Sequence, residues 1–163
     1  MSFWIAERSF DIDTLIRAPL AEVRSFLDDP QKWVGFQPLI LGITEEPSRP
    51  GFYRISERLK VAGVPVKFGY RARIEPHDGG VDSEAWTAPF IHVANRLRWT
   101  AEGSSTRLSE SSHLDGPRPL MSFVVRTAKT AHIAMLERIR REIEGRERGE
   151  PSPAGAARLT PER

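Results

Sequence analysis

Alternating apolar and polar positions run through most of this chain. The clearest case is the segment 67–74, KFGYRARI, in which every second residue is apolar or aromatic and the others are basic or glycine. Successive side chains of a strand point to opposite faces, so this segment predicts a strand with one buried face and one solvent-facing face. Six further segments resemble it or show part of the same alternation: 3–17, 39–44, 53–60, 81–88, 92–101 and 106–115.

Short connections rich in glycine, proline or small polar residues separate these segments, at 46–51, 62–65, 76–80 and 102–105. Connections of this length join antiparallel neighbours. The pattern therefore predicts an antiparallel sheet of about seven strands.

Helical spacing appears in two places. After the first strand, Pro19 opens a short helix, since proline suits the first helical position, and Leu20, Val23 and Phe26 recur at helical intervals. A second short helical turn is expected at 31–36. The final segment, 120–144, contains no glycine or proline and predicts a long amphipathic helix. Its apolar stripe comprises Leu120, Met121, Val124, Val125, Ala128, Ala131, His132, Met135, Leu136, Ile139 and Ile143.

The side chains in the middle of this stripe are unusually small. Ala128 and Ala131 occupy the part of the helix that should lie opposite the centre of the sheet. Small residues there either leave space for a ligand or let the helix approach the sheet more closely, and the sequence leaves both interpretations open.

Charge indicates which side of each strand faces inward. Asp82 and Glu84 would lie between arginines of the two neighbouring strands, at 71 and 73 and at 96 and 98, and cross-strand pairs of opposite charge stabilise an exposed face. We therefore expect these acids to face outward. By the period of two, the inward positions of the last two strands are Asn95, Leu97, Trp99, Leu108, Glu110, Ser112 and Leu114.

Length and composition narrow the function classes. The 163 residues suit one domain, at 1–145, followed by a tail, 146–163, that lacks apolar periodicity and is expected to be disordered. There is no cysteine, no apolar run long enough to span a membrane and no secretory signal, so we expect a cytoplasmic protein without stable membrane insertion. The net charge is only +2, and Arg138, Arg140 and Arg141 are interleaved with Glu137, Glu142 and Glu144 at i, i+4 spacing, which argues against nucleic-acid binding.

Several segments resemble the START-like superfamily, also called SRPBCC, which includes Bet v 1-like proteins and the polyketide cyclase/dehydrase and lipid-transport family. They are LIRAP at 15–19, the helix LAEVRSFLDDP at 20–30, the motif Trp33-x-x-Phe36-x-Pro38, LRWT at 97–100, TRL at 106–108 and the closing helix. The resemblance covers residues 3–145. It implies an α+β helix-grip fold: a curved antiparallel sheet, two short helices after the first strand, and a long C-terminal helix over the concave face. It also implies an elongated apolar cavity that binds a hydrophobic small molecule.

Polar residues on the predicted inner face are the candidates for chemistry. A carboxylate in an apolar pocket has a raised pKa, which suits proton transfer near neutral pH. We therefore take Glu57, Glu110 and His132 as candidate acid/base residues. The candidate ligand-binding residues are Trp33, Phe36, Phe68, Tyr70, Asn95, Leu97, Trp99, Ser112, Ala128, Ala131 and Met135.

Three functions remain open on this basis. The first is a carrier or receptor for a polyketide-, sterol- or lipid-like molecule, and the second is a cofactor-independent polyketide cyclase or dehydratase. The third is a protein-interaction module. No metal site is expected, because the four histidines are scattered, and no cofactor is expected, because phosphate-loop, dinucleotide and nucleophile-elbow motifs are missing from the sequence. The oligomeric state is not determined by the sequence.

Overall fold

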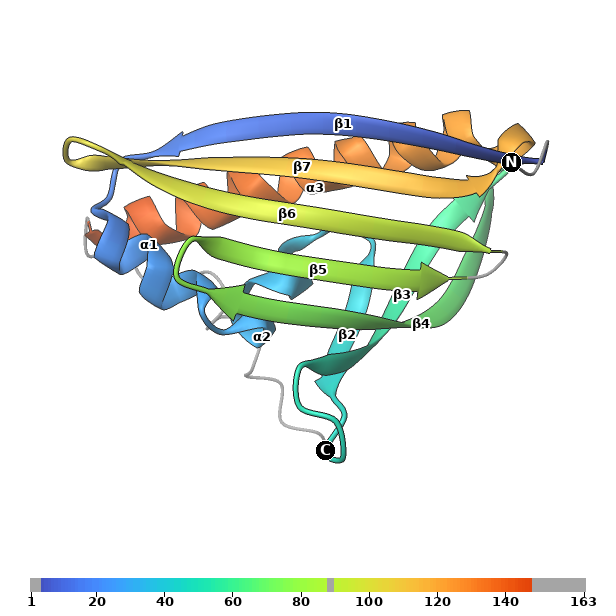
Figure 1. Cartoon of the computed structure of the whole chain (residues 1–163), viewed down its shortest axis with the longest axis horizontal. Helices are drawn as coiled ribbons and strands as arrows, with labels where there is room; N and C mark the ends of the chain where they lie inside the picture. The colour runs from blue at the N-terminus through green and yellow to red at the C-terminus, as the bar shows by residue number, and fades with distance from the viewer. Residues whose placement is uncertain (1–3, 88–89, 148–163) are drawn as a thin grey trace, which may run out of the picture.

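The computed structural model describes residues 4–87 and 90–147, and in these a curved sheet is crossed by one long helix (Figure 1). The seven strands follow the order β1-β7-β6-β5-β4-β3-β2, and every neighbouring pair is antiparallel. Each strand from β2 to β6 thus pairs with the next strand in the chain, while β1 pairs with β7. The strands are β1 (Ile5–Ile16), β2 (Ile40–Glu45), β3 (Phe52–Val61), β4 (Val64–His77), β5 (Gly80–Thr87), β6 (Ile91–Glu102) and β7 (Ser105–Pro117).

Short helices connect β1 to β2, and the long helix follows β7 directly. Their bounds are α1 (Leu20–Leu27), α2 (Pro30–Trp33), the 3-10 helix η1 (Val34–Phe36) and α3 (Arg118–Glu147). The α+β helix-grip architecture expected from the sequence is confirmed. No helix within the described residues has the length and apolar character needed to cross a membrane.

Some boundaries differ from the expected ones. Pro19 is not the first helical residue of α1 but its N-cap, with an extended ψ of 150°, and its carbonyl accepts the backbone N–H groups of Glu22 and Val23. The turn between β3 and β4 consists of Ala62 and Gly63 rather than the expected 62–65. Both residues have positive φ, the conformation of a two-residue hairpin turn. The helix α3 continues two residues past the expected domain end at 145, and the rest of the expected tail, 148–163, lies outside the described residues.

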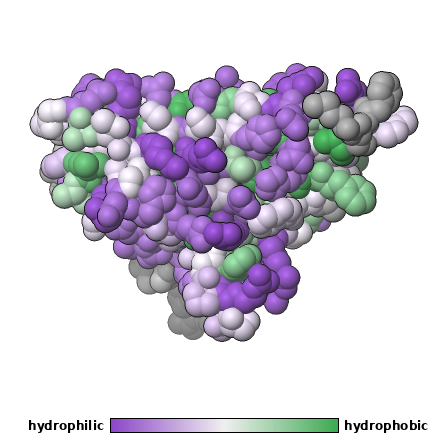
Figure 2. All heavy atoms as spheres, in the orientation of Figure 1, coloured by the Kyte–Doolittle hydropathy of each residue, from purple (hydrophilic) through white to green (hydrophobic). Residues whose placement is uncertain are grey.

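The sidedness argument from charge is confirmed. Asp82 lies on the outer face of β5, where the Arg98 guanidinium contacts its carboxylate at 2.6 Å, and Glu84 pairs in register with Arg73 of β4. On the inner face, Leu97, Trp99, Leu108 and all other inward positions predicted for β7 are buried. Figure 2 shows the consequence: the face turned to the viewer is largely hydrophilic.

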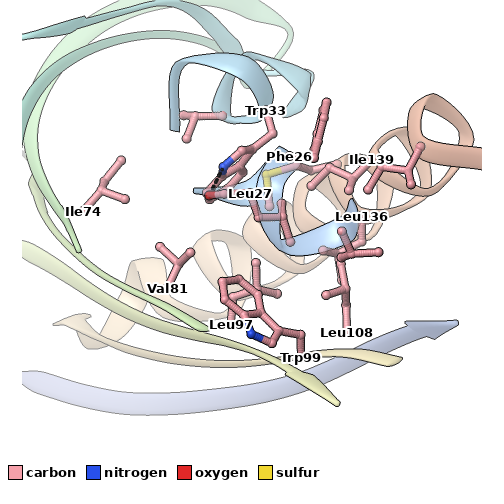
Figure 3. Packing of buried hydrophobic residues seen from close by; sticks show 14 of the residues in the cluster. Phe26, Leu27, Trp33, Ile74, Val81, Leu97, Trp99, Leu108, Leu136 and Ile139 are labelled. Carbon is pink, nitrogen blue, oxygen red and sulfur yellow. Dashed lines mark hydrogen bonds between the residues drawn. The ribbon is translucent and has the colours of Figure 1, made fainter. Parts of the chain in front are cut away.

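Buried apolar residues form two clusters under the helix. The larger one joins α1, α2, β3–β7 and the C-terminal half of α3, where Met135, Leu136, Ile139 and Ile143 supply the helix side (Figure 3). The smaller one joins β1, β7 and the first half of α3. The predicted apolar stripe is thus largely buried, except that Leu120 is 38% exposed in the first turn of the helix.

Close packing at the start of β5 supplies a stability test. A Cβ added at Gly80 would lie 2.0 Å from the backbone oxygen of Leu97 on β6, so Gly80→Ala must displace one of two paired strands. We expect it to lower the free energy of unfolding by about 3 kcal/mol, measured by urea denaturation.

The matched control is Gly35→Ala in η1, where a Cβ would meet no heavy atom within 4 Å. This variant should change stability by less than about 0.5 kcal/mol. Equal stability of the two variants would contradict the close approach of β5 to β6.

Candidate functional site

A cavity of about 80 Å³ lies between the inner face of the sheet and the middle of α3. Its wall is formed by β2–β7, by α2 and η1, and by two side chains of the long helix, and it is mainly apolar. Much of its apolar wall belongs to the larger core cluster, which includes Met135, whereas Ala128 of α3 packs in the smaller cluster and does not line the cavity. Seven of the residues predicted from the sequence line it: Trp33, Tyr70, Asn95, Leu97, Glu110, His132 and Met135.

Other predicted residues lie behind this wall and hold it in place. Ser112 donates a hydrogen bond to Glu110 at 3.4 Å, and Glu57 accepts one from Tyr70 at 3.1 Å. Trp99 is buried in the larger cluster, with its indole N–H bonded to the backbone oxygen of Asp78. These residues support the site without lining the cavity.

The remaining predicted ligand-binding residues pack elsewhere. Phe68 stacks on the ring of Tyr70. Phe36 packs on Phe26, and the Arg138 guanidinium lies over the Phe36 ring, 4.8 Å from the ring centre. Ala128 and Ala131 do not line the cavity either.

The two alanines instead let the helix lie close to the sheet. Ala131 is 3% exposed, and Ala128 packs against the cluster that contains Phe10 of β1 and Leu114 of β7. Of the two interpretations of the small stripe, the structure shows close helix approach at these positions.

A buried pair of ionisable side chains joins the sheet to α3. His132 Nδ1 lies 2.5 Å from Glu110 Oε1, and the side chains are only 12% and 3% exposed. Sequence alternation placed Glu110 inward on β7, and the helical stripe placed His132 on the sheet side of α3. The fold brings these two predicted residues into contact.

Glu110 determines the charge state of His132. Burial acts to lower the pKa of His132, but the negative charge of Glu110, its hydrogen bond and the more distant Glu57 together raise it above the ordinary value of 6.5. The imidazole is therefore protonated over a wider pH range than a free histidine. In either form Nδ1 bonds Glu110, which leaves Nε2 as the nitrogen available for proton exchange.

A second buried carboxylate, Glu57, lies behind the cavity wall and contacts Tyr70. Burial raises the pKa of Glu57, while hydrogen bonds from Tyr70 and Gln37 and the charge of His132 act against that rise. Burial, and then the neighbouring Glu57, raise the pKa of Tyr70, so its hydroxyl keeps its proton and donates it to Glu57. The hydroxyl of Tyr70 is thus already used within the protein.

Nine of the residues that line the cavity were missing from the sequence-based set, and two of these nine, Gln37 and Ser83, are polar. Gln37 follows η1 in an irregular segment where no periodicity indicates its direction. Ser83 had a usable signal, because the alternation that places Asp82 and Glu84 outward places Ser83 inward. Among the residues that the structure describes, no group of three histidine, aspartate or glutamate side chains is arranged to hold a metal ion.

The buried pair predicts a pH-dependent contribution to stability. A raised pKa of His132 means that the folded state binds its proton more tightly, so this stabilisation is complete below about pH 6.5 and is lost as pH rises through the folded pKa. We expect His132→Gln to lower the free energy of unfolding by about 3 kcal/mol at about pH 6, because Glu110 loses its partner, and by less at about pH 9.

Chemical denaturation of both proteins at the two pH values measures this difference. His113→Gln is the control for removing a histidine, since His113 contacts the Ser9 hydroxyl on the exposed face of β7. A difference between wild type and His132→Gln that grows with pH would contradict a protonated His132.

Comparison with known proteins gives information on the fold. No family model matches the sequence, and no curated protein matches it. Among solved structures, the Zhui aromatase/cyclase from Streptomyces sp. R1128 matches with a TM-score of 0.69 and 17% identity, over 90% of this chain and 100% of that one. Norcoclaurine synthase from Thalictrum flavum matches with a TM-score of 0.64 and 11% identity, over 88% and 98%.

A START superfamily protein from Mycobacterium smegmatis matches with a TM-score of 0.60 and 14% identity, over 86% of this chain and 97% of that one. At these identities the likeness concerns the fold rather than the activity. Together with the strand order and the position of α3, it shows that this chain has the START/Bet v 1-like, or SRPBCC, helix-grip fold.

Proposed function

We propose that the protein binds a hydrophobic small molecule in the cavity between the sheet and α3. The observation that carries this proposal is an apolar-walled space at the centre of the fold into which a few buried polar groups face, which is the usual composition of a small-molecule site. Aromatase/cyclases and START superfamily proteins share this fold, which supports a polyketide-, sterol- or lipid-like ligand.

The size of the cavity limits how such a ligand is accommodated. About 80 Å³ is well below the roughly 300–1,000 Å³ of pockets that enclose drug-sized molecules. A ligand larger than a small ring therefore requires part of the wall to move. Strands β3 to β7 are joined by ladders without a register shift, whereas α2 and η1 contain only four and three residues. We expect α2 and η1 to shift on binding, because short helical turns open at lower cost.

Filling the cavity tests the binding proposal. Ala85 of β5 lines the space, so Ala85→Leu should occupy part of it and weaken the binding of a lipophilic fluorescent dye about tenfold or more. The matched control is Ala94→Leu, whose position on β6 pairs with the outward Glu84 and His113.

Dye titration followed by fluorescence measures both variants, with circular dichroism to check folding. Tight, saturable binding that Ala85→Leu leaves unchanged would place the dye outside the cavity.

A second candidate function, acid/base catalysis, is favoured by the contact between Glu110 and His132. A carboxylate that holds one imidazole nitrogen orients the other nitrogen and stabilises the protonated ring, which is the arrangement used by general-base histidines. In a cyclase or dehydratase, His132 would take the proton next to a carbonyl carbon and return it to the carbonyl oxygen or to the leaving hydroxyl. Glu57 does not line the cavity, so it would act only through the hydroxyl of Tyr70, which donates to it.

The composition of the cavity wall supports cyclisation less than it supports binding. None of the residues described as lining the cavity is lysine or arginine. A developing enolate would therefore have only His132 as a cationic partner. For this reason binding is our principal proposal, and catalysis is the alternative.

Substitution of the buried pair separates the two functions. The compound for the assay is to be identified by native mass spectrometry of protein purified from its own host, as a small molecule that co-purifies. If the protein is an enzyme, Glu110→Gln and His132→Ala should lower turnover of that compound about 100-fold or more, while its Kd changes much less.

The control is Glu137→Gln on the solvent side of α3, where Glu137 pairs with Arg140 and Arg141. Turnover that survives both changes in the buried pair would remove Glu110 and His132 from the catalytic assignment while leaving the binding proposal intact.

A further inference from the structure

Three side-chain oxygens in the cavity wall have no hydrogen-bond partner among the described residues: Gln37 Oε1, Asn95 Oδ1 and Glu110 Oε2. They come from η1's C-terminal end, β6 and β7, so they surround the space from different elements. Gln37 and Glu110 are only 8% and 3% exposed. A buried acceptor without a partner is costly, typically by about 1–3 kcal/mol, so three in one wall call for a partner in the cavity.

The partners of the neighbouring atoms show that all three groups are acceptors. The Asn95 amide nitrogen donates to the Ser83 hydroxyl at 3.3 Å, and Gln37 donates to Glu57. The donor end of each amide is thus used within the protein, and the oxygen is left over. Glu110 uses Oε1 for His132 and Ser112, which leaves Oε2.

The charges around the cavity restrict the ligand further. Among the described lining residues the only group that carries positive charge is His132, and Glu110 already pairs with it. Glu57 adds a second buried carboxyl group close to Tyr70 and Gln37. A carboxylate or phosphate ligand would meet acceptor oxygens without a free cation, which disfavours free fatty acids and other anions.

We propose that the cavity selects an uncharged ligand that presents at least two hydroxyl donors on an otherwise apolar ring, so that the hydroxyls bond Gln37, Asn95 and Glu110. This inference rests on the proposed binding function and specifies its ligand class. It narrows the expected polyketide-, sterol- or lipid-like ligands to those that present hydroxyl donors, because a purely apolar surface would leave the three oxygens without partners.

Single-ring probes test this inference, since they demand the smallest expansion of the cavity. Resorcinol and m-xylene have the same ring and similar substituent volumes, but only resorcinol has hydroxyl donors, while 3-hydroxybenzoate adds a negative charge. Titration of the full chain, followed by amide chemical shifts in NMR, gives the three affinities. We expect resorcinol to bind about tenfold or more tightly than m-xylene, and 3-hydroxybenzoate to bind more weakly than resorcinol.

Variants assign the preference to the named oxygens. Gln37→Met and Asn95→Leu each remove one acceptor with little change in volume, so each should reduce the preference for resorcinol over m-xylene about fivefold or more. The two substitutions lie in different elements, so the test still works if one of the variants fails to fold. The matched control is Gln31→Met on the exposed side of α2, which should leave the preference unchanged.

The outcomes distinguish this inference from the function on which it rests. If m-xylene binds in the cavity as tightly as resorcinol, the protein is an apolar carrier and the donor-selective inference is wrong. If 3-hydroxybenzoate binds more tightly than resorcinol, the charge argument is wrong. If none of the probes shifts the amides of cavity residues, the binding proposal itself fails.

Discussion

A carboxylate and a histidine meet in the interior where the long helix crosses the sheet, and most features of the site follow from that contact. Removing both groups from water is unfavourable, and a buried ion pair seldom stabilises a protein more than apolar residues of the same volume would. The contact between Glu110 and His132 is therefore poorly explained by stability alone. What it does provide is a fixed polar point between two apolar clusters, with one imidazole nitrogen and one carboxylate oxygen left over.

The cavity exists because α3 packs against the sheet on both sides of the contact between Glu110 and His132. Toward its C-terminus, Met135, Leu136 and Ile139 pack into the larger cluster, and toward its N-terminus Ala128 and Met121 lie close to β1 and β7. The side chains of the strands opposite do not fill the space completely, and a cavity of about 80 Å³ remains. The small residues Ala128 and Ala131 thus let the helix lie close to the sheet, while the cavity lies next to the contact between Glu110 and His132.

Most of the fold could be predicted because strand alternation and helical spacing are local properties. The outward-facing side of β5 followed from Asp82 and Glu84, since opposite charges across an exposed face favour one side. Part of the site followed as well, because Glu110 and His132 each lie on the inner side of a regular element. The position of Gln37 could not be predicted, since it follows a 3-10 turn in which no period relates sequence position to direction.

The sequence by itself determined which side of each strand and of the long helix is buried, because the periods of 2 and 3.6 residues depend only on backbone geometry. Only the tertiary structure decided how far apart the helix and sheet lie at each point, since that distance depends on how side chains from several elements pack together. It is this packing that made the cavity small, placed Ala128 and Ala131 outside its wall, and left three oxygens facing inward without partners in the described residues.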